Sequence, residues 1–311
     1  MIGYKRSLLF LICLSLCTVT VNSVAGGNTF SIEEVTPGNY LHRGTNAGFN
    51  DPGHDDIANI GFITGDNCVA VIDTGGSVTI GNALLNALRS VTDKPVCYVI
   101  NTHVHFDHVL GNLAFINEKP EFVGHVNLPD AIEANRGFFL DKFRNYLGEA
   151  PSEKSIIAPT RTVAKTLSLD LGNRKLILTA YKKAHTYTDL SVFDEKTKTF
   201  WAGDLVFREH IPVIDGSLKG WLDVIQTLKK QDVALIIPGH GPVADNWGTA
   251  ISAEEEYLTR LLHETRKAIA EGQFMEEAID TIGLNEKDKW QLFDEHHKAN
   301  VSRAFTELEW E

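Results

Sequence analysis

The sequence predicts a mixed fold of helices and β-strands, and three observations support this prediction. Short apolar runs bounded by Gly, Asn, Asp and Pro recur between residues 30 and 240, which is typical of strands. Residues 78–91 place apolar side chains at helical spacing, so that one face of a helix can cover a sheet. From about residue 246 the sequence is rich in Glu and poor in strand formers. The 311 residues and 43% hydrophobic content fit an ordinary globular protein.

Residues 1–25 differ from the rest of the chain. Two basic residues precede an apolar run from Leu8 to Val21, and small residues at 23–25 provide a cleavage site. This pattern predicts a secretory signal peptide and a periplasmic or secreted protein with no integral span after cleavage. A membrane anchor is less favoured because the apolar stretch is short for a spanning helix. A lipoprotein signal at Cys17 is a minor alternative, since the bulky Leu16 precedes it.

The formal net charge is -12, and removing the two basic residues of the signal peptide leaves -14. Binding to nucleic acid calls for clustered Lys and Arg, and the sequence has no such cluster around its motifs. We therefore expect a small-molecule substrate and no nucleic-acid partner.

In chain order, the first half alternates strands and helices. Beyond the helix over 78–91, a short helix is expected over 109–116 and a longer one over 131–147. The expected strands are Phe30–Val35, Tyr40–Arg43, Ile57–Ile63, Val69–Ile72, Val96–Ile100 and Phe122–Gly124.

The second half predicts another group of strands, one helix over 218–228 and a helical extension over 251–311. In the extension, Leu258, Leu261, Val301 and Phe305 belong to two apolar stripes, which either close one side of a cleft or only cover apolar surface. The expected strands are Val163–Leu167, Lys175–Thr179, Leu190–Phe193, Thr199–Ala202 and Val233–Ile237.

Two cysteines, Cys68 and Cys97, remain after signal cleavage, each at the start of an apolar run. A disulfide in an exported protein and two buried thiols are both compatible with this pattern. Neither residue falls on a motif position, so we assign neither to a metal.

The densest group of potential metal ligands lies in Thr102-His103-Val104-His105-Phe106-Asp107-His108, just after the apolar run 96–100. Residues two apart at a strand end point the same way, so His103 and His105 can hold one ion together. Asp107 and His108, on the loop that follows, suit a second ion. Such nitrogen and oxygen ligands favour zinc, iron or manganese over calcium.

This His-x-His-x-Asp-His motif resembles that of the metallo-β-lactamase superfamily, and the rest of that family's pattern follows in order. Asp73 lies in a matching strand and glycine turn, and His185, Asp204 and His240 match later ligand positions. The resemblance covers roughly residues 30–250. It implies a four-layer αββα sandwich over residues 26–250, followed by the helical extension.

The resemblance also implies a dinuclear zinc hydrolase, with iron or manganese as alternative metals. A metal-bridging hydroxide would attack an ester, thioester, lactone or β-lactam carbonyl, because two ions lower the pKa of a shared water from ~15.7 towards ~7. Asp107 would be the catalytic residue that shuttles the proton. The implied ligands are His103, His105 and His185 for one metal, Asp107, His108 and His240 for the other, and Asp204 between them.

Two alternatives stay open. Persulfide dioxygenases resemble the same scaffold but hold one iron, here through His103, His185 and Asp204. Exported relatives that resemble the chain, including its last residues 307–311, are associated with quinoprotein dehydrogenase systems, which implies a non-catalytic partner role. An aspartate at 204 resembles the glyoxalase II branch more than the drug-degrading enzymes. No basic set in the extension corresponds to a glutathione site.

The remaining polar residues are interpreted more simply. Asp73 either orients a ligand histidine or caps the turn at residues 75–76. His42 and His54 lie on early loops that can border the cleft in this fold, and we do not expect them to bind substrate. The histidines interpreted as surface or packed residues are His125, His210, His296 and His297.

Overall fold

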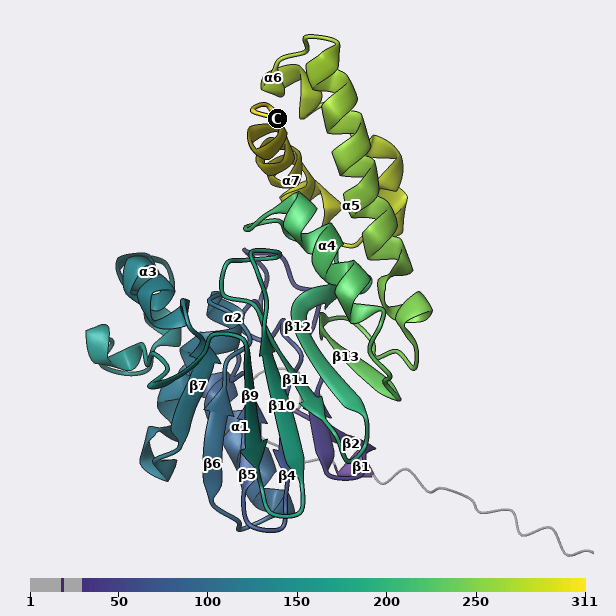
Figure 1. Ribbon diagram of the computed structural model, residues 1–311. Helices are drawn as coiled ribbons and strands as arrows, with labels where there is room; N and C mark the ends of the chain where they lie inside the picture. The colour runs from purple at the N-terminus through teal and green to yellow at the C-terminus, as the bar shows by residue number, and fades with distance from the viewer. Residues whose placement is uncertain (1–17, 20–29) are drawn as a thin grey trace, which may run out of the picture.

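Alternating apolar residues build two β-sheets that pack face to face in the computed structural model, which describes residues 18–19 and 30–311 (Figure 1). The predicted signal peptide falls outside the described residues except for Thr18–Val19, which form the edge strand β1. Strands β5 to β8 run parallel, as do β12 and β13, and the other pairs are antiparallel.

The first sheet has eight strands in sequence order. They are β1 (Thr18–Val19), β2 (Ile32–Thr36), β3 (Asn39–His42), β4 (Ile60–Thr64), β5 (Val69–Ile72), β6 (Val96–Ile100), β7 (Glu121–His125) and β8 (Arg161–Val163). The second sheet has five strands in the order β13-β12-β11-β10-β9. They are β9 (Thr166–Asp170), β10 (Lys175–Ala180), β11 (Leu190–Asp194), β12 (Thr199–Phe207) and β13 (Leu235–His240).

Helix α1 (Val78–Val91) covers the outer face of the first sheet, helices α4 (Leu218–Leu228) and α5 (Trp247–Ala270) pack on the second, and the remaining helices lie at one end of the sandwich or in the C-terminal extension. The remaining helices are α2 (Phe106–Val109), α3 (Leu128–Lys142), α6 (Met275–Ala278) and α7 (Phe293–Leu308). Short 3-10 helices cover Leu110–Glu118, Arg144–Tyr146, Glu153–Ser155 and Leu284–Lys289. No helix within the described residues is long and apolar enough to cross a membrane.

The alternation of side chains along β5 explains the layers. Val69 and Val71 pack with Leu84 and Leu88 of α1 on the outer face of the first sheet, whereas Ile72 packs between the sheets. A third apolar cluster joins the second sheet to α4, α5 and α7. These clusters produce the layer order helix, sheet, sheet, helix, which confirms the predicted αββα sandwich with C-terminal helices.

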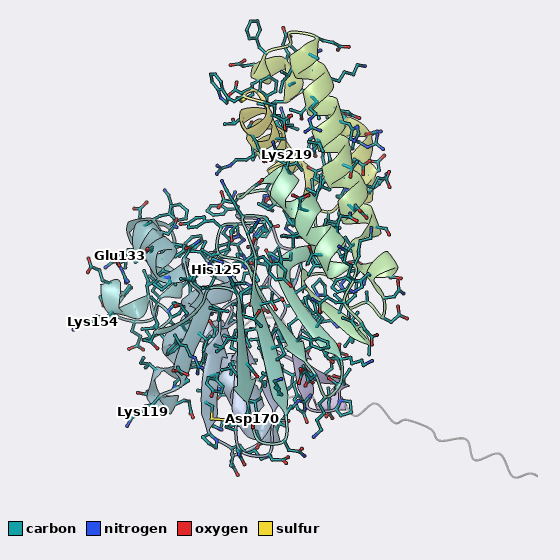
Figure 2. The ribbon with its side chains drawn as sticks, in the orientation of Figure 1. Lys119, His125, Glu133, Lys154, Asp170 and Lys219 are labelled. Atoms are coloured by element: carbon teal, nitrogen blue, oxygen red, sulfur yellow. A yellow bond between two sulfur atoms is a disulfide. The ribbon has the colours of Figure 1, made fainter. Side chains whose placement is uncertain are left out.

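The helical extension rises from one end of the sandwich (Figure 1). Leu258, Leu261, Val301 and Phe305, from its two predicted stripes, are buried in the same cluster as α4. The labelled residues Lys119 and Asp170 lie at the opposite end of the sandwich (Figure 2).

Three details of the predicted elements are wrong. The expected strand 163–167 is divided, because the chain crosses from β8 to β9 at residues 164–165. Val163 and Leu167, on either side of the crossing, both pack in the cluster between the sheets. The expected helix over 109–116 is mainly a 3-10 helix. The strand expected to end at Ala202 continues to Phe207, because β13 pairs with it beyond that point.

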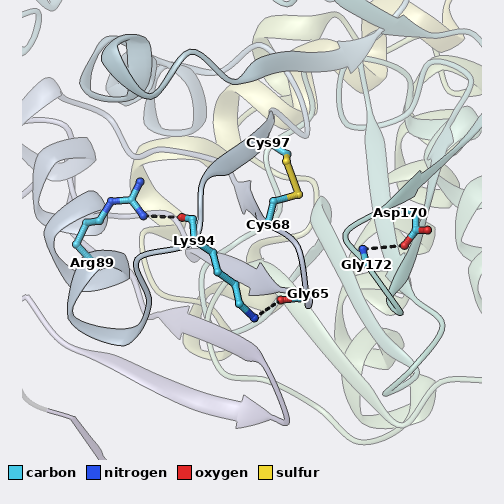
Figure 3. The surroundings of a disulfide bond; sticks show 7 residues. All are labelled: Gly65, Cys68, Arg89, Lys94, Cys97, Asp170 and Gly172. Atoms are coloured by element: carbon cyan, nitrogen blue, oxygen red, sulfur yellow. Dashed lines mark hydrogen bonds between the residues drawn. A yellow bond between two sulfur atoms is a disulfide. The ribbon is translucent and has the colours of Figure 1, made fainter.

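A disulfide joins Cys68 and Cys97, whose Cα atoms are 5.8 Å apart (Figure 3). It links the residue before β5 to the parallel neighbour β6. Nearby, the Lys94 ammonium donates to the Gly65 carbonyl at 2.6 Å, and Arg89 donates to the Lys94 carbonyl at 2.7 Å (Figure 3). The two possibilities left open by the sequence are thus resolved in favour of a bond.

Replacing both cysteines with Ala is expected to lower the free energy of unfolding by about 3–4 kcal/mol, because the bond closes a loop of 29 residues in the unfolded chain. Urea unfolding of oxidised wild type and of the double variant measures this difference. Activity should be retained because the bond lies away from the ligand histidines. Equal midpoints and slopes for the two proteins would contradict the expectation.

Candidate metal centre

Seven side chains form two adjoining groups of candidate metal ligands. Within each group, the nitrogen or oxygen atoms that could bind an ion all lie within 4.8 Å of one another. The first contains His103, His105, His185 and Asp204, and the second contains Asp107, His108 and His240. All seven predicted ligand positions are therefore brought together.

The ligands come from the ends of strands and the turns after them. His103 and His105 lie in the turn after β6, not on the strand, which ends at Ile100. Asp107 and His108 lie in the single-turn helix α2 rather than in a loop. His185 lies between β10 and β11, and His240 is the last residue of β13.

Asp204 lies inside β12, rather than on the connection after it, and its carboxylate is between the two groups. Its Oδ2 is 3.7 Å from His103 Nε2, 3.4 Å from His185 Nε2 and 3.3 Å from His240 Nε2. Its Oδ1 is 3.2 Å from His108 Nε2. One carboxylate thus contacts histidines of both groups.

Gly239 explains why a glycine precedes the last histidine. A Cβ atom at this position would collide with Oδ1 of Asp204 on the neighbouring strand. The small residue is therefore required by the approach of β13 to the Asp204 carboxylate.

Three buried polar atoms at the centre have no hydrogen-bond partner: His103 Nε2, His108 Nε2 and Asp204 Oδ1. Unpartnered buried polar atoms are costly and rare in folded proteins. Divalent ions would satisfy all three, and imidazole and carboxylate donors suit zinc, iron or manganese. The residues present therefore fit a metal site.

Contacts at Nδ1, the ring nitrogen that faces away from the candidate metal positions, orient two of the ligand histidines. His185 Nδ1 lies 2.7 Å from the Val213 carbonyl, and His240 Nδ1 lies 3.0 Å from the Ile57 carbonyl. Each contact leaves Nε2 facing the candidate metal positions.

Asp73 orients a ligand, which resolves the two interpretations of this residue. Its Oδ2 lies 2.8 Å from His108 Nδ1, and its Oδ1 accepts the Thr102 backbone N–H at 2.8 Å. The helix α1, which follows the turn at residues 75–76, is capped by Ser77, whose hydroxyl accepts from the Ile80 backbone N–H. Asp73 therefore links the turn after β5 to the histidine motif.

The protonation states differ between the two groups in the metal-free protein. Burial lowers the pKa of His103 and brings the pKa of His185 to about 3, so both rings are neutral. Burial opposes ionisation of Asp204, yet His240 and His108 hold its pKa well below the usual range. Burial also opposes protonation of His240, but Asp204 and Asp107 raise its pKa to about 9. Metal binding at the second group would therefore displace protons.

A family sequence model described as "Metallo-beta-lactamase superfamily" matches residues 54–240, which contain all seven candidate ligands. The chain belongs to the metallo-beta-lactamase superfamily. The predicted resemblance is confirmed, and the His and Asp groups of this superfamily member can hold metal.

Two named proteins are similar in sequence to part of this metallo-beta-lactamase superfamily member. The "Beta-lactamase-like protein 2 homolog" of Caenorhabditis elegans is 24% identical over 200 residues, covering 64% of this chain and 60% of that protein. The "Linear primary-alkylsulfatase" of a Pseudomonas species is 36% identical over 58 residues, covering 19% of this chain and 11% of the relative. The chain thus matches less than two thirds of either relative's length.

Two solved structures share the fold. A metallo-beta-lactamase from Pontibacter korlensis has a TM-score of 0.60 at 19% identity, covering 74% of this chain and 99% of that structure. A stereoselective inverting sec-alkylsulfatase from a Pseudomonas species has a TM-score of 0.67 at 17% identity, covering 90% of this chain and 50% of that structure. At these identities the likeness concerns the fold alone.

A cavity of about 220 Å³ opens beside the candidate ligands. Five of them line it, namely His105, Asp107, His185, Asp204 and His240. The rest of the wall is aromatic, aliphatic or imidazole. It consists of Ala47, Phe49, His54, Ile57, Phe106, Phe207, His210, Val213 and His296.

His54 borders the cavity, as its early loop allowed, whereas sequence reasoning missed His210 and His296 as cavity residues. No spacing rule connects these two to the motif, because they come from the segment after β12 and from helix α7. The interpretation as packed residues is supported for His125, which bonds the Tyr181 carbonyl, and for His297, which bonds Tyr257.

The helical extension reaches the cavity through α7, which carries His296. Glu295 accepts the Phe49 backbone N–H at 3.2 Å, and Gln291 just before α7 accepts from Asn46 at 2.8 Å. The extension therefore closes one side of the cleft as well as covering apolar surface.

A second contact connects α7 to a ligand. Nδ1 of His105 is 3.0 Å from His185 Nε2, whereas Nε2 of His105 is 3.3 Å from Oδ2 of Asp215. The other Asp215 oxygen accepts from Arg303 of α7 at 2.8 Å. Asp215 thus orients the His105 ring so that Nδ1 of His105 faces His185 and the other ligands of the first group.

Replacing Asp215 with Ala is expected to weaken metal binding at the first group by roughly tenfold to a hundredfold, because His105 loses the partner that orients its ring. Competition with a chromophoric chelator measures the dissociation constant. Arg303→Ala is the control, since it keeps the contact between Asp215 and His105, and its effect should be smaller. Unchanged affinity in Asp215→Ala would contradict this role.

Proposed function

We propose that the protein is a dinuclear zinc hydrolase that cleaves a carbonyl substrate. The observation that supports this most strongly is the Asp204 carboxylate, placed between two groups of candidate ligands. His103, His105 and His185 would hold one ion, and Asp107, His108 and His240 the other. When bound, two divalent ions lower the pKa of a shared water towards neutrality and polarise a carbonyl oxygen.

The chain's own residues would carry the remaining steps. Asp107 lines the cavity, with Oδ2 3.3 Å from His108 Nε2 and 3.4 Å from His240 Nε2. Its carboxylate is placed to accept the proton of the attacking water and return it to the leaving group. In the reaction, the water oxygen bonds to the acyl carbon, the bond to the leaving group breaks, and the leaving group departs with the proton.

The test is the metal content of purified protein, measured by elemental mass spectrometry, combined with a hydrolysis panel. The panel contains an ester, a thioester, a lactone, a β-lactam and, because one named relative and one structure with the same fold are alkylsulfatases, an alkyl sulfate. We expect close to two zinc ions per chain and hydrolysis that is lost on chelation and restored by zinc.

One iron per chain, with oxygen uptake on a persulfide, would overturn this proposal in favour of the dioxygenase alternative. That alternative uses only His103, His185 and Asp204, and leaves four candidate ligands without a role, namely His105, Asp107, His108 and His240. The convergence of all seven side chains supports two metals.

We also propose that the protein is exported. The disulfide between Cys68 and Cys97 supports an oxidising compartment, in which such bonds persist. Fractionation of cells that produce the full chain, with N-terminal sequencing, tests both export and cleavage after Ala25. The quinoprotein dehydrogenase partner stays a prediction.

A further inference from the structure

The cavity wall beyond the candidate ligands consists of aromatic, aliphatic and imidazole side chains. Among the described residues that line it there is no Lys or Arg, and the two carboxylates, Asp107 and Asp204, are candidate metal ligands. An anionic group of a substrate that lay away from the metals would be buried without a counter-ion, which is costly. The wall therefore disfavours substrates with a second, anionic group.

One polar side chain in this wall has no partner within the protein. His54 is 6% exposed, and neither ring nitrogen has a hydrogen-bond partner. Its ring stacks on Phe106, with centroids 4.7 Å apart, and meets the edge of Phe49 at 5.1 Å. A buried imidazole without a partner is costly unless a ligand supplies the missing hydrogen bond.

The aromatic side of the cavity is open to a ligand. Phe49 is 55% exposed although it lines the cavity, and its backbone N–H is held by Glu295 of α7. Phe106 is supported from behind by Phe143, with parallel rings 4.4 Å apart. An apolar cavity of roughly 150 Å³ holds a benzene ring, so about 220 Å³ suffices for one ring and an adjoining carbonyl group.

We propose that the substrate is an uncharged ester or lactone with one compact apolar group, which packs against Phe49 and Phe106 while His54 hydrogen-bonds to a polar atom beside the reacting carbonyl. This inference rests on the proposed hydrolase function and names its substrate class. His54 is then a residue that determines specificity, and Phe49 and Phe106 form the surface on which the apolar group packs.

A matched pair of substrates tests the charge preference. Phenyl acetate and 4-acetoxybenzoate differ by one carboxylate, and rates are corrected for the reaction without protein. Using zinc-loaded full chain, we expect kcat/KM for phenyl acetate to exceed that for 4-acetoxybenzoate by at least tenfold. Equal values, or a preference for the carboxylated ester, would overturn the inference.

Variants of the cavity wall test the hydrogen bond from His54 and the packing of the apolar group on Phe49. His54→Phe retains a ring stacked on Phe106 but removes both nitrogens, and we expect KM for phenyl acetate to rise about tenfold with metal content unchanged. Phe49→Ala should lower kcat/KM for phenyl acetate more than for ethyl acetate, which has no ring. The controls are His263→Ala and Phe274→Ala, which change exposed residues outside the cavity.

The outcomes separate this inference from the function on which it rests. If zinc-loaded protein hydrolyses no member of the panel, both the proposed function and the inference fail. If it hydrolyses esters but His54→Phe and Phe49→Ala behave like wild type, only the inference fails. Variants that lose their circular dichroism signal are replaced by His54→Gln and Phe49→Leu, with the same expected directions.

Discussion

An Asp204→Ala variant is expected to fold, to retain little metal and to lose activity by roughly a thousandfold or more. The carboxylate lies within 3.7 Å of histidine nitrogens from both groups, so its removal takes a ligand from each metal position at once. A thousandfold loss corresponds to about 4 kcal/mol of transition-state stabilisation, a reasonable value for a disrupted metal site.

Three measurements on this variant belong together: metal per chain, kcat/KM and the circular dichroism spectrum of the metal-free protein. Asp232→Ala is the matched control, because this exposed aspartate pairs with Lys198 at the protein surface, outside the cavity wall. An Asp204→Ala protein with two metals and a wild-type rate would refute the ligand assignment.

The second large effect is expected for Asp107→Asn, which keeps the size of the side chain but removes its basic carboxylate oxygen. We expect kcat to fall by roughly a hundredfold to ten-thousandfold at saturating zinc, since proton transfer by a positioned group contributes about this factor. Weaker binding of the second metal should accompany the loss, because Asp107 is also a candidate ligand of that metal, with Oδ2 3.4 Å from His240 Nε2.

Zinc titration separates these two effects of Asp107→Asn. If added zinc restored the full rate, the residue would act only as a ligand, and its assigned role in proton transfer would be wrong. Asp141→Asn provides the control for an amide substitution, since Asp141 is exposed on α3.

The helical extension gives this chain features that its motifs do not predict. Helix α7 supplies His296 to the cavity, binds the loop that carries Phe49 through Glu295, and contacts Asp215 through Arg303. The same helix therefore contacts both the substrate side of the cavity and the residue that holds His105. Variation in the extension is expected to change substrate preference and metal affinity together.

The ligands of the histidine motif and the strand pattern could be predicted from the sequence for a local reason, whereas His185, Asp204 and His240 were implied by the resemblance. Four of the ligands lie within six residues, so the path of one short turn already brings them near each other. Strand alternation assigns side chains to faces, as in β5, because neighbouring residues must point to opposite sides. Together with the resemblance, these local rules led to the αββα sandwich.

Only the tertiary structure decided the relations between distant segments. It paired Cys68 with Cys97, set Asp73 against His108, and divided the continuous pattern 163–167 between two sheets. It also placed His296 in the cavity wall, although this residue lies far beyond His240, the last candidate ligand in the sequence. These contacts depend on how whole layers and helices pack, and local periodicity carries no information about which remote side chains that packing makes neighbours.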